Sequence, residues 1–245
     1  MKKLFRYSGS KLTLLSKYRS VPKGTKRIVE PYLGSGSFVL NQKIQGIGFD
    51  TNSDIVAMWH WLQDCSVKDL LELNRLIESY RMLKEKPDVR EFNLELGPQT
   101  YVRINITSLV VGQLSSWKIY PQHRLPIEDT IECLSRIKDI EVINCNALEY
   151  RHEDGDFLFI DPPYVGTKAN YLDNTRKTSQ EKRYNPSSTI KLIDSTSNPI
   201  IFTYGTNAPI IFPQYDWEVV SVKSVPNMRL GGSIKRIEHV SYINW

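Results

Sequence analysis

The tetrapeptide Asp161-Pro162-Pro163-Tyr164 has the residue types that methylation of an aromatic amine requires. Such an amine is a poor nucleophile, because its lone pair is delocalised into the ring. The Asp161 carboxylate and the Pro162 carbonyl can accept its two hydrogens, which localises the lone pair for attack on a methyl sulfonium. The prolines fix the backbone and bring no competing N–H group, and Tyr164 can stack on a base rotated out of a duplex. The tetrapeptide therefore indicates an amino-group methyltransferase, with an ordinary proline-rich loop as the alternative.

A second segment, Glu30-Pro31-Tyr32-Leu33-Gly34-Ser35-Gly36-Ser37 followed by Asp50, is typical of a nucleoside cofactor site. Gly34 and Gly36 let a ligand approach the backbone closely, and Asp50 can accept hydrogen bonds from ribose hydroxyls. A dinucleotide site would need a third glycine near Val39. A sulfonium cofactor needs no pyrophosphate cradle, so the segment favours S-adenosylmethionine. The alternative is a strand–helix turn whose glycines serve geometry alone.

Hydrophobic periodicity predicts the elements that position both segments. Strands are expected at 26–30, 44–49, 141–144, 156–160, 199–203, 217–222 and 239–243, and helices from Ser37 and at 53–64, 68–84 and 127–137. The alternation of strands and helices indicates an α/β protein with a parallel sheet. Residues 59–140 are mostly helical and interrupt it. We therefore predict a discontinuous catalytic domain, residues 1–58 and 141–245, with residues 59–140 inserted.

The positive charge of the chain is clustered. The net charge is +5, and residues 1–27 carry nine Lys or Arg and no acid. Residues 166–191 carry six bases against two acids, and residues 222–245 carry four against one. Clustered bases suit a polyanion, because phosphate contacts release condensed counterions. A solvated basic face is the alternative, so charge alone does not decide for nucleic acid.

Several other classes of protein are disfavoured by composition. The three cysteines and four histidines form no zinc or disulfide pattern, so we predict no metal site. No window reaches the roughly 18 apolar residues of a membrane span, and no apolar signal core follows the basic N-terminus. We expect a cytoplasmic protein of a bacterium or a phage-infected host, without a membrane partner, acting as a monomer or weak dimer.

The order of these motifs resembles that of Dam-type DNA adenine methyltransferases, the alpha group of the D12 class. The resemblance rests on residues 7–11, 29–37, 49–54, 161–164 and the basic segment 229–236, and it covers residues 5–65 and 140–245. It implies a Rossmann-like, seven-stranded S-adenosylmethionine-dependent methyltransferase sheet with an inserted, mostly helical target-recognition domain. The implied activity is methyl transfer to adenine N6 in double-stranded DNA, with base flipping, as in restriction–modification.

The same resemblance implies a role for individual residues. Asp161, Pro162 and Tyr164 would be catalytic. Asp50 would hold the cofactor ribose, and Asn146 and Ala147 would lie beside its adenine. The full predicted cofactor set is Tyr7, Lys11, Glu30, Pro31, Gly34, Gly36, Asp50, Asn146, Ala147 and Asp161. Phosphate contacts are expected from Arg229, Lys235 and Arg236.

The inserted segment departs from the family pattern. Members that read GATC carry an Arg-Tyr-Asn-like segment and then a Phe-Asn-x-Pro-Phe-Gly-like one, whereas this chain has residues 101–105 and 117–121 there. Arg103 and Asn105 could read guanine and adenine, or they could be ordinary helix or loop residues. GATC specificity is therefore not supported.

Two other classes of function stay open at the level of sequence. The tetrapeptide chemistry serves any conjugated amine, so RNA adenine and the N4 amine of DNA cytosine are alternative targets. A protein glutamine target more often goes with Asn at position 161. A non-catalytic nucleic-acid-binding protein on the same fold is the third possibility, and the intact Gly34, Gly36, Asp50, Asp161 and Tyr164 argue against it.

Overall fold

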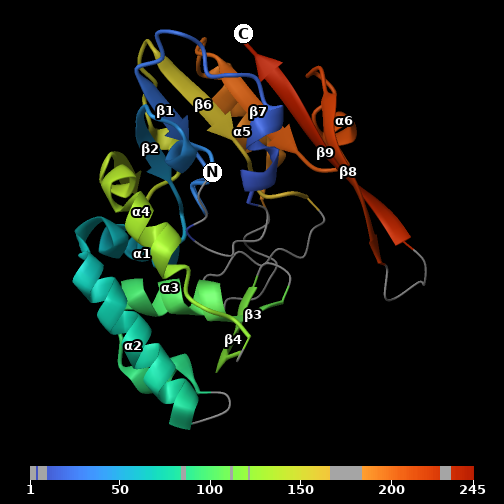
Figure 1. Ribbon diagram of the computed structural model, residues 1–245. Coiled ribbons are helices and arrows are strands. Elements are labelled where there is room, and N and C mark those ends of the chain that lie inside the picture. Colours follow the sequence, from blue (N-terminus) through green and yellow to red (C-terminus); the bar gives the residue numbers. More distant parts are fainter. Residues whose placement is uncertain are drawn as a thin grey trace.

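A seven-stranded sheet with the strand order β5-β2-β1-β6-β7-β9-β8 is the centre of the fold (Figure 1). The computed structural model describes residues 4, 10–83, 87–110, 113–120, 122–165, 184–226 and 233–245. The strands are β1 (Arg27–Glu30), β2 (Gln45–Phe49), β5 (Ile140–Ile143), β6 (Asp156–Ile160), β7 (Ile200–Tyr204), β8 (Glu218–Pro226) and β9 (Ser233–Ile243). Each of them overlaps a strand that the sequence predicts. The α/β methyltransferase-like sheet is therefore confirmed.

The five strands from β5 to β7 are parallel, and β9 runs antiparallel between β7 and β8. Every residue of β6 and of β7 is buried, as expected for central strands covered on both faces. One face of β6 packs against Phe38, whose ring stacks on Phe159 with centroids 4.2 Å apart. Because the strands are parallel, their carboxyl ends meet at one edge of the sheet.

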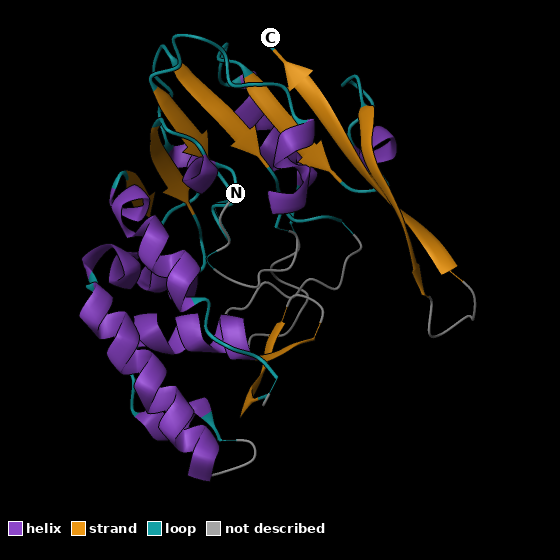
Figure 2. Cartoon of the chain, viewed as in Figure 1, coloured by secondary structure: helices purple, strands orange, loops and turns teal. Residues whose placement is uncertain are grey.

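The segment between β2 and β5 contains most of the helices (Figure 2). It comprises α1 (Ser53–Asp64), α2 (Val67–Leu83), the 3-10 turn η3 (Val89–Phe92), α3 (Leu96–Ile106), the hairpin β3 (Thr107–Val110) and β4 (Gln113–Ile119), and α4 (Ile127–Lys138). The 3-10 helix η1 (Leu12–Lys17) precedes β1, and η4 (Ala147–Glu149) follows β5. Helices α5 (Pro186–Asp194) and α6 (Ala208–Ile211) flank β7. Along the described residues, no helix is both long and apolar enough to cross a membrane.

Two local predictions differ from the structure. The helix expected from Ser37 is only the 3-10 turn η2 (Val39–Asn41), because Gln42 is already extended and β2 begins three residues later. Gly97 and Pro98 are residue types that predict a break in helical structure, yet both lie in the first turn of α3. A proline is tolerated there because the N–H it lacks would have no partner within the helix.

The predicted domain boundary after residue 58 falls inside α1. On this helix Trp59 packs against the loop after β1, while Trp61 lies 5.4 Å from Tyr101 of α3. One continuous cluster of buried side chains joins Phe157 of the sheet to Ile104 of α3. Residues 59–140 therefore share a hydrophobic core with the sheet, and their role as a target-recognition unit stays a prediction.

Candidate active site

Three acidic residues stand at the carboxyl ends of neighbouring strands. Glu30 ends β1, Asp50 follows β2 and Asp161 follows β6, and β1 pairs with both other strands. Ligands of open α/β sheets bind at this edge. The fold thus brings the glycine-containing segment with Asp50 close to the tetrapeptide, although Asp50 and Asp161 lie 111 positions apart in the sequence.

The Asp161 carboxylate is held through one of its two oxygens. Its Oδ1 lies 2.9 Å from Lys11 Nζ and accepts a hydrogen bond of 2.9 Å from Thr203 Oγ1. The Tyr164 hydroxyl is a third, longer neighbour of Oδ1 at 3.4 Å. Among the described residues, the hydrogen bonds and the ion pair of Asp161 all involve Oδ1 and not Oδ2. These contacts hold the carboxylate through Oδ1 and do not use Oδ2.

Lys11 is buried, with its side chain only 4% exposed, and its ammonium forms an ion pair with Asp161 of the tetrapeptide. Its Nζ donates to the Tyr164 hydroxyl at 2.6 Å and lies 3.7 Å from Glu238 Oε2. Its backbone N–H donates to Ser37 Oγ at 3.3 Å, which ties the N-terminal segment to the loop after β1. The sequence predicts that Lys11 contacts the cofactor. In the structure its ammonium contacts Asp161 and Tyr164 of the tetrapeptide.

Tyr164 is held at its hydroxyl and along its ring. The hydroxyl donates to Glu238 Oε2 at 2.8 Å, and the ring centroid lies 4.6 Å from that of Tyr204. Burial, followed by the charges of Asp161 and Glu238, raises the pKa of Tyr164 well above its ordinary value. The phenol therefore stays protonated and acts as a donor.

Sequence reasoning missed four residues around Tyr164: Thr203, Tyr204, Gly205 and Glu238. Thr203 and Tyr204 end β7, the strand next to β6, so the rule that ligands bind at carboxyl ends could have found them. Gly205 follows directly, and a Cβ there would come within 2.8 Å of the Tyr164 ring. Glu238 lies on the antiparallel β9, and only the register of that strand, Tyr204 opposite His239, brings it here.

The glycine loop, residues 33–37 after β1, is fixed from two sides. Gly34 and Gly36 have φ of 44° and 55°, a region that favours glycine. The Gly34 N–H donates to Asp50 Oδ2 at 3.0 Å, and the Trp59 indole N–H donates to the Gly34 carbonyl at 3.1 Å. A Cβ on Gly36 would come within 2.6 Å of the Trp59 ring. Gly36 thus serves packing on α1, while Gly34 orients Asp50.

Glu30 and Pro31 lie behind this loop and are buried. The Glu30 carboxylate is 3% exposed and accepts the Val39 N–H at 3.0 Å. Burial raises its pKa well above the ordinary value for Glu. These two predicted cofactor residues support the loop, and the Glu30 carboxylate is directed to the backbone of η2.

The N-terminal part of the chain matches the model of a protein family. Residues 7–107 match the family model of the D12 class N6 adenine-specific DNA methyltransferases. This match covers 101 of the 245 residues, so it shows what the N-terminal part of the chain is similar to: an adenine-specific DNA methyltransferase. The match includes the glycine loop, Asp50 and α1–α3 and ends before the tetrapeptide. A comparison with curated proteins finds no match.

The last predicted cofactor residues of the methyltransferase lie beyond β5. The Asn146 side-chain oxygen Oδ1 accepts the Leu148 N–H at 3.1 Å and caps η4, and Ala147 is buried against the core. The Asn144 amide donates to the Asp50 backbone carbonyl at 2.9 Å. The end of β5 is thus tied to Asp50, on the side of the sheet edge opposite Thr203.

The predicted DNA-binding residues fall into three groups. Arg229 and the predicted cofactor residue Tyr7 lie outside the described residues. Lys235 and Arg236 are exposed on β9. Arg103 and Asn105, in contrast, are 2% and 0% exposed within α3.

The burial of Arg103 and Asn105 corrects their interpretation as base-reading residues. The Arg103 guanidinium lies 3.6 Å from the centroid of the Trp117 ring, and the Asn105 amide donates to the Tyr101 carbonyl at 3.0 Å. Both side chains are buried among protein groups and are not exposed to solvent in this arrangement. Their placement fits the alternative, ordinary helix residues that join α3 to its neighbours.

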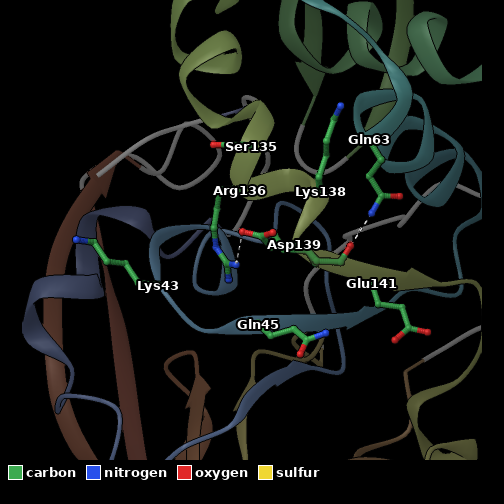
Figure 3. Close-up of a pocket in the computed structure, with 9 residues that line it drawn as sticks. Lys43, Gln45, Gln63, Ser135, Arg136, Lys138, Asp139 and Glu141 are labelled. Carbon is green, nitrogen blue, oxygen red and sulfur yellow. Dashed lines mark hydrogen bonds and ion pairs between the residues drawn. The ribbon is translucent and has the colours of Figure 1, made fainter.

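A hollow of about 690 Å³ lies at the opposite end of the strands (Figure 3). It is lined by Gln45 and Ile140, the first residues of β2 and β5, and by Arg136. The Arg136 guanidinium donates to the Val39 and Ile44 carbonyls and lies 3.7 Å from Asp139. These contacts connect α4 to the sheet, and the hollow is separate from the methyltransferase site.

Proposed function

We propose that the enzyme transfers the methyl group of S-adenosylmethionine to N6 of adenine in double-stranded DNA, at the tetrapeptide Asp161–Tyr164. The carrying observation is the meeting of this tetrapeptide with the glycine loop and Asp50 at one sheet edge. A methyl donor and an amine can then be bound side by side. The match of residues 7–107 to adenine-specific DNA methyltransferases supports adenine in DNA over RNA adenine or the N4 amine of cytosine.

The residues at the sheet edge fit this cofactor. Asp50 presents a carboxylate oriented by the Gly34 and Asn52 N–H groups, which suits ribose hydroxyls. The Asp50 and Asp161 carboxylates at the strand ends suit a cationic sulfonium and would repel a pyrophosphate. When bound, the cofactor would be held at its ribose by Asp50 and would supply an electrophilic methyl group on a positively charged sulfur for the amine beside Asp161.

The tetrapeptide activates and orients the amine. Lys11, Thr203 and Tyr164 converge on Asp161 Oδ1. We infer that Oδ2 accepts one hydrogen of the target amine and the Pro162 carbonyl accepts the other. Because the carboxylate is already fixed, little reorganisation is needed at the moment of reaction. Tyr164 offers its ring to the flipped base.

The DNA is recognised first by charge. Lys235 and Arg236 on β9 are exposed and suit phosphate contacts. A target in cellular DNA would place the enzyme in the cytoplasm of a bacterium or a phage-infected host, as a monomer or weak dimer. Residues 59–140, next to the glycine loop, are the proposed target-recognition unit.

Product analysis after methylation tests this function. The protein is incubated with labelled S-adenosylmethionine and mixed-sequence duplex DNA, and the DNA is digested to nucleosides. We expect N6-methyladenine from the wild type and a loss of about 1,000-fold or more in Asp161→Ala, whose circular dichroism stays native. Asp216→Ala, an exposed aspartate away from the site, is the matched control. Methylation of cytosine or RNA alone, or undiminished activity in Asp161→Ala, would contradict the proposal.

A further inference from the structure

Glu238 on β9 brings a second carboxylate to the tetrapeptide. Its Oε2 accepts the Tyr164 hydroxyl at 2.8 Å and lies 3.7 Å from Lys11 Nζ. Its side chain is 29% exposed. It is separated from Tyr164 by 74 positions and comes from β9, which runs antiparallel beside β7. Nothing in the amine chemistry of the tetrapeptide requires it.

Glu238 adds a second carboxylate to the buried Lys11–Asp161 pair. The Lys11 ammonium and the Asp161 carboxylate lie 2.9 Å apart. Burial raises the pKa of both neighbouring phenols, Tyr18 and Tyr164, so neither adds charge. Among the described groups that contact Lys11, Glu238 is therefore a second source of negative charge beside Asp161.

A second carboxylate has a consequence for methyl transfer. The methyl donor would be a cation at sulfur, whereas the product thioether would be neutral. A further negative charge favours the cation over the neutral product in a partly buried environment, where charges interact more strongly than in water.

We propose that Glu238 is a positioning residue that gives the site its preference for the cationic methyl donor and holds the Tyr164 hydroxyl. The inference rests on the proposed function and adds to it the residue that discriminates substrate from product. Glu238 acts through Lys11 and Tyr164. It gives the Lys11 ammonium a second carboxylate to bind besides Asp161. The lysine can then remain bound while Asp161 accepts the target amine.

The test compares two ligands that differ in one methyl group and one charge. The dissociation constants of S-adenosylmethionine and S-adenosylhomocysteine are measured by calorimetry for the wild type and for Glu238→Gln. The amide retains an oxygen that can accept the Tyr164 hydroxyl but carries no charge. We expect binding of the cationic ligand to weaken roughly tenfold and binding of the neutral ligand to change less than about twofold.

Two further variants complete the design. Glu218→Gln removes a carboxylate from the neighbouring β8, where it pairs with Arg19 at 2.9 Å, and should leave both constants unchanged. Glu238→Asp keeps the charge and should keep the preference for the cation; it also serves if Glu238→Gln does not fold. Equal weakening of both ligands, or an unchanged ratio, would overturn the role of Glu238 alone. A wild type that binds neither ligand would overturn the proposed function together with it.

Discussion

Tyr164 shows how single residues of this enzyme are fixed by partners remote in sequence. Its hydroxyl contacts Lys11 and Glu238, and its ring packs on Tyr204. Each contact comes from a different segment of the chain. A base that stacks on Tyr164 therefore meets a ring whose orientation is set in advance, which lowers the cost of ordering the site.

Gly205→Ala tests whether the position of this ring matters. The added methyl would come within 2.8 Å of the Tyr164 ring, so the ring must move. We expect the rate of methyl transfer to fall at least about tenfold, because small misplacements at a reacting centre are costly. Single-turnover transfer measures it. Gly24→Ala, where a Cβ meets nothing within 4 Å and only the backbone is strained at φ 90°, is the control. Equal rates in both variants would contradict the expectation.

At the scale of elements, α1 holds the glycine loop in place. The helix begins at Ser53, with the Asn52 side chain accepting the Asp54 N–H as its cap. Its Trp59 bonds the Gly34 carbonyl and fills the space beside Gly36. The loop conformation therefore depends on a helix that the sequence alone would assign to core packing.

Trp59→Phe should weaken cofactor binding. The substitution removes the indole N–H that bonds the Gly34 carbonyl and leaves a buried acceptor unsatisfied, at a cost of about 1–3 kcal/mol. We expect part of this cost to appear as a several-fold higher dissociation constant for S-adenosylmethionine by calorimetry. Trp61→Phe, the same change half a turn away against Tyr101, should alter stability without altering that constant. The reverse pattern would show that α1 does not hold the loop.

The junction of η3 with β4 depends on a charge. The Asp88 carboxylate caps η3 by accepting the Arg90 N–H and also pairs with the Arg90 guanidinium at 2.7 Å. Asp88 forms a β-bridge with Lys118 of β4. The Arg90 hydrogen bonds lower the pKa of Asp88 to about 2. The carboxylate therefore stabilises the fold at neutral pH.

Asp88→Asn should lose this contribution with a definite dependence on pH. Because the folded pKa lies below the unfolded value of 3.8, the stabilisation is complete above pH 4 and is lost as the pH falls towards 2. We expect the free energy of unfolding to drop by about 1–2 kcal/mol at pH 7, after allowance for the exposed Arg90, and the difference to shrink below pH 4. Urea unfolding at several pH values measures it. A difference that does not vary with pH would contradict the assignment.

For the whole molecule, the arrangement of charge decides how DNA can approach. The long strands β8 and β9 project to one side of the sheet, and the helices of the segment between β2 and β5 gather at the other (Figure 1). In the strand order of the sheet, β7 separates the catalytic strands β2, β1 and β6 from β9 and β8. The exposed Lys235 and Arg236 belong to the projecting pair.

Removal of these two charges should change the salt dependence of DNA binding. In Lys235→Ala/Arg236→Ala we expect weaker binding to any duplex and a slope of log K against log salt that is smaller by about 1–2. Titrations of labelled duplex at several salt concentrations measure the slope. Lys68→Ala/Lys138→Ala removes two exposed charges from α2 and α4 and should leave it unchanged. A slope equally reduced in both variants would mean that only net charge matters.

The sequence by itself determined the sheet and the identity of its central motifs. All seven strands, the glycine loop, Asp50 and the tetrapeptide are local patterns, because apolar periodicity and loop residue types act over a few neighbours. Only the tertiary structure decided the contacts between distant segments. These are the contacts of Glu238 with Tyr164, of Thr203 with Asp161, and of Trp59 with the glycine loop. Burial also separated Arg103 and Asn105 from the surface: Trp117 meets Arg103 only when α3 packs, whereas Asn105 bonds the Tyr101 carbonyl within α3 itself. Strand register and helix packing join distant residues, and neither leaves a local signal in the chain.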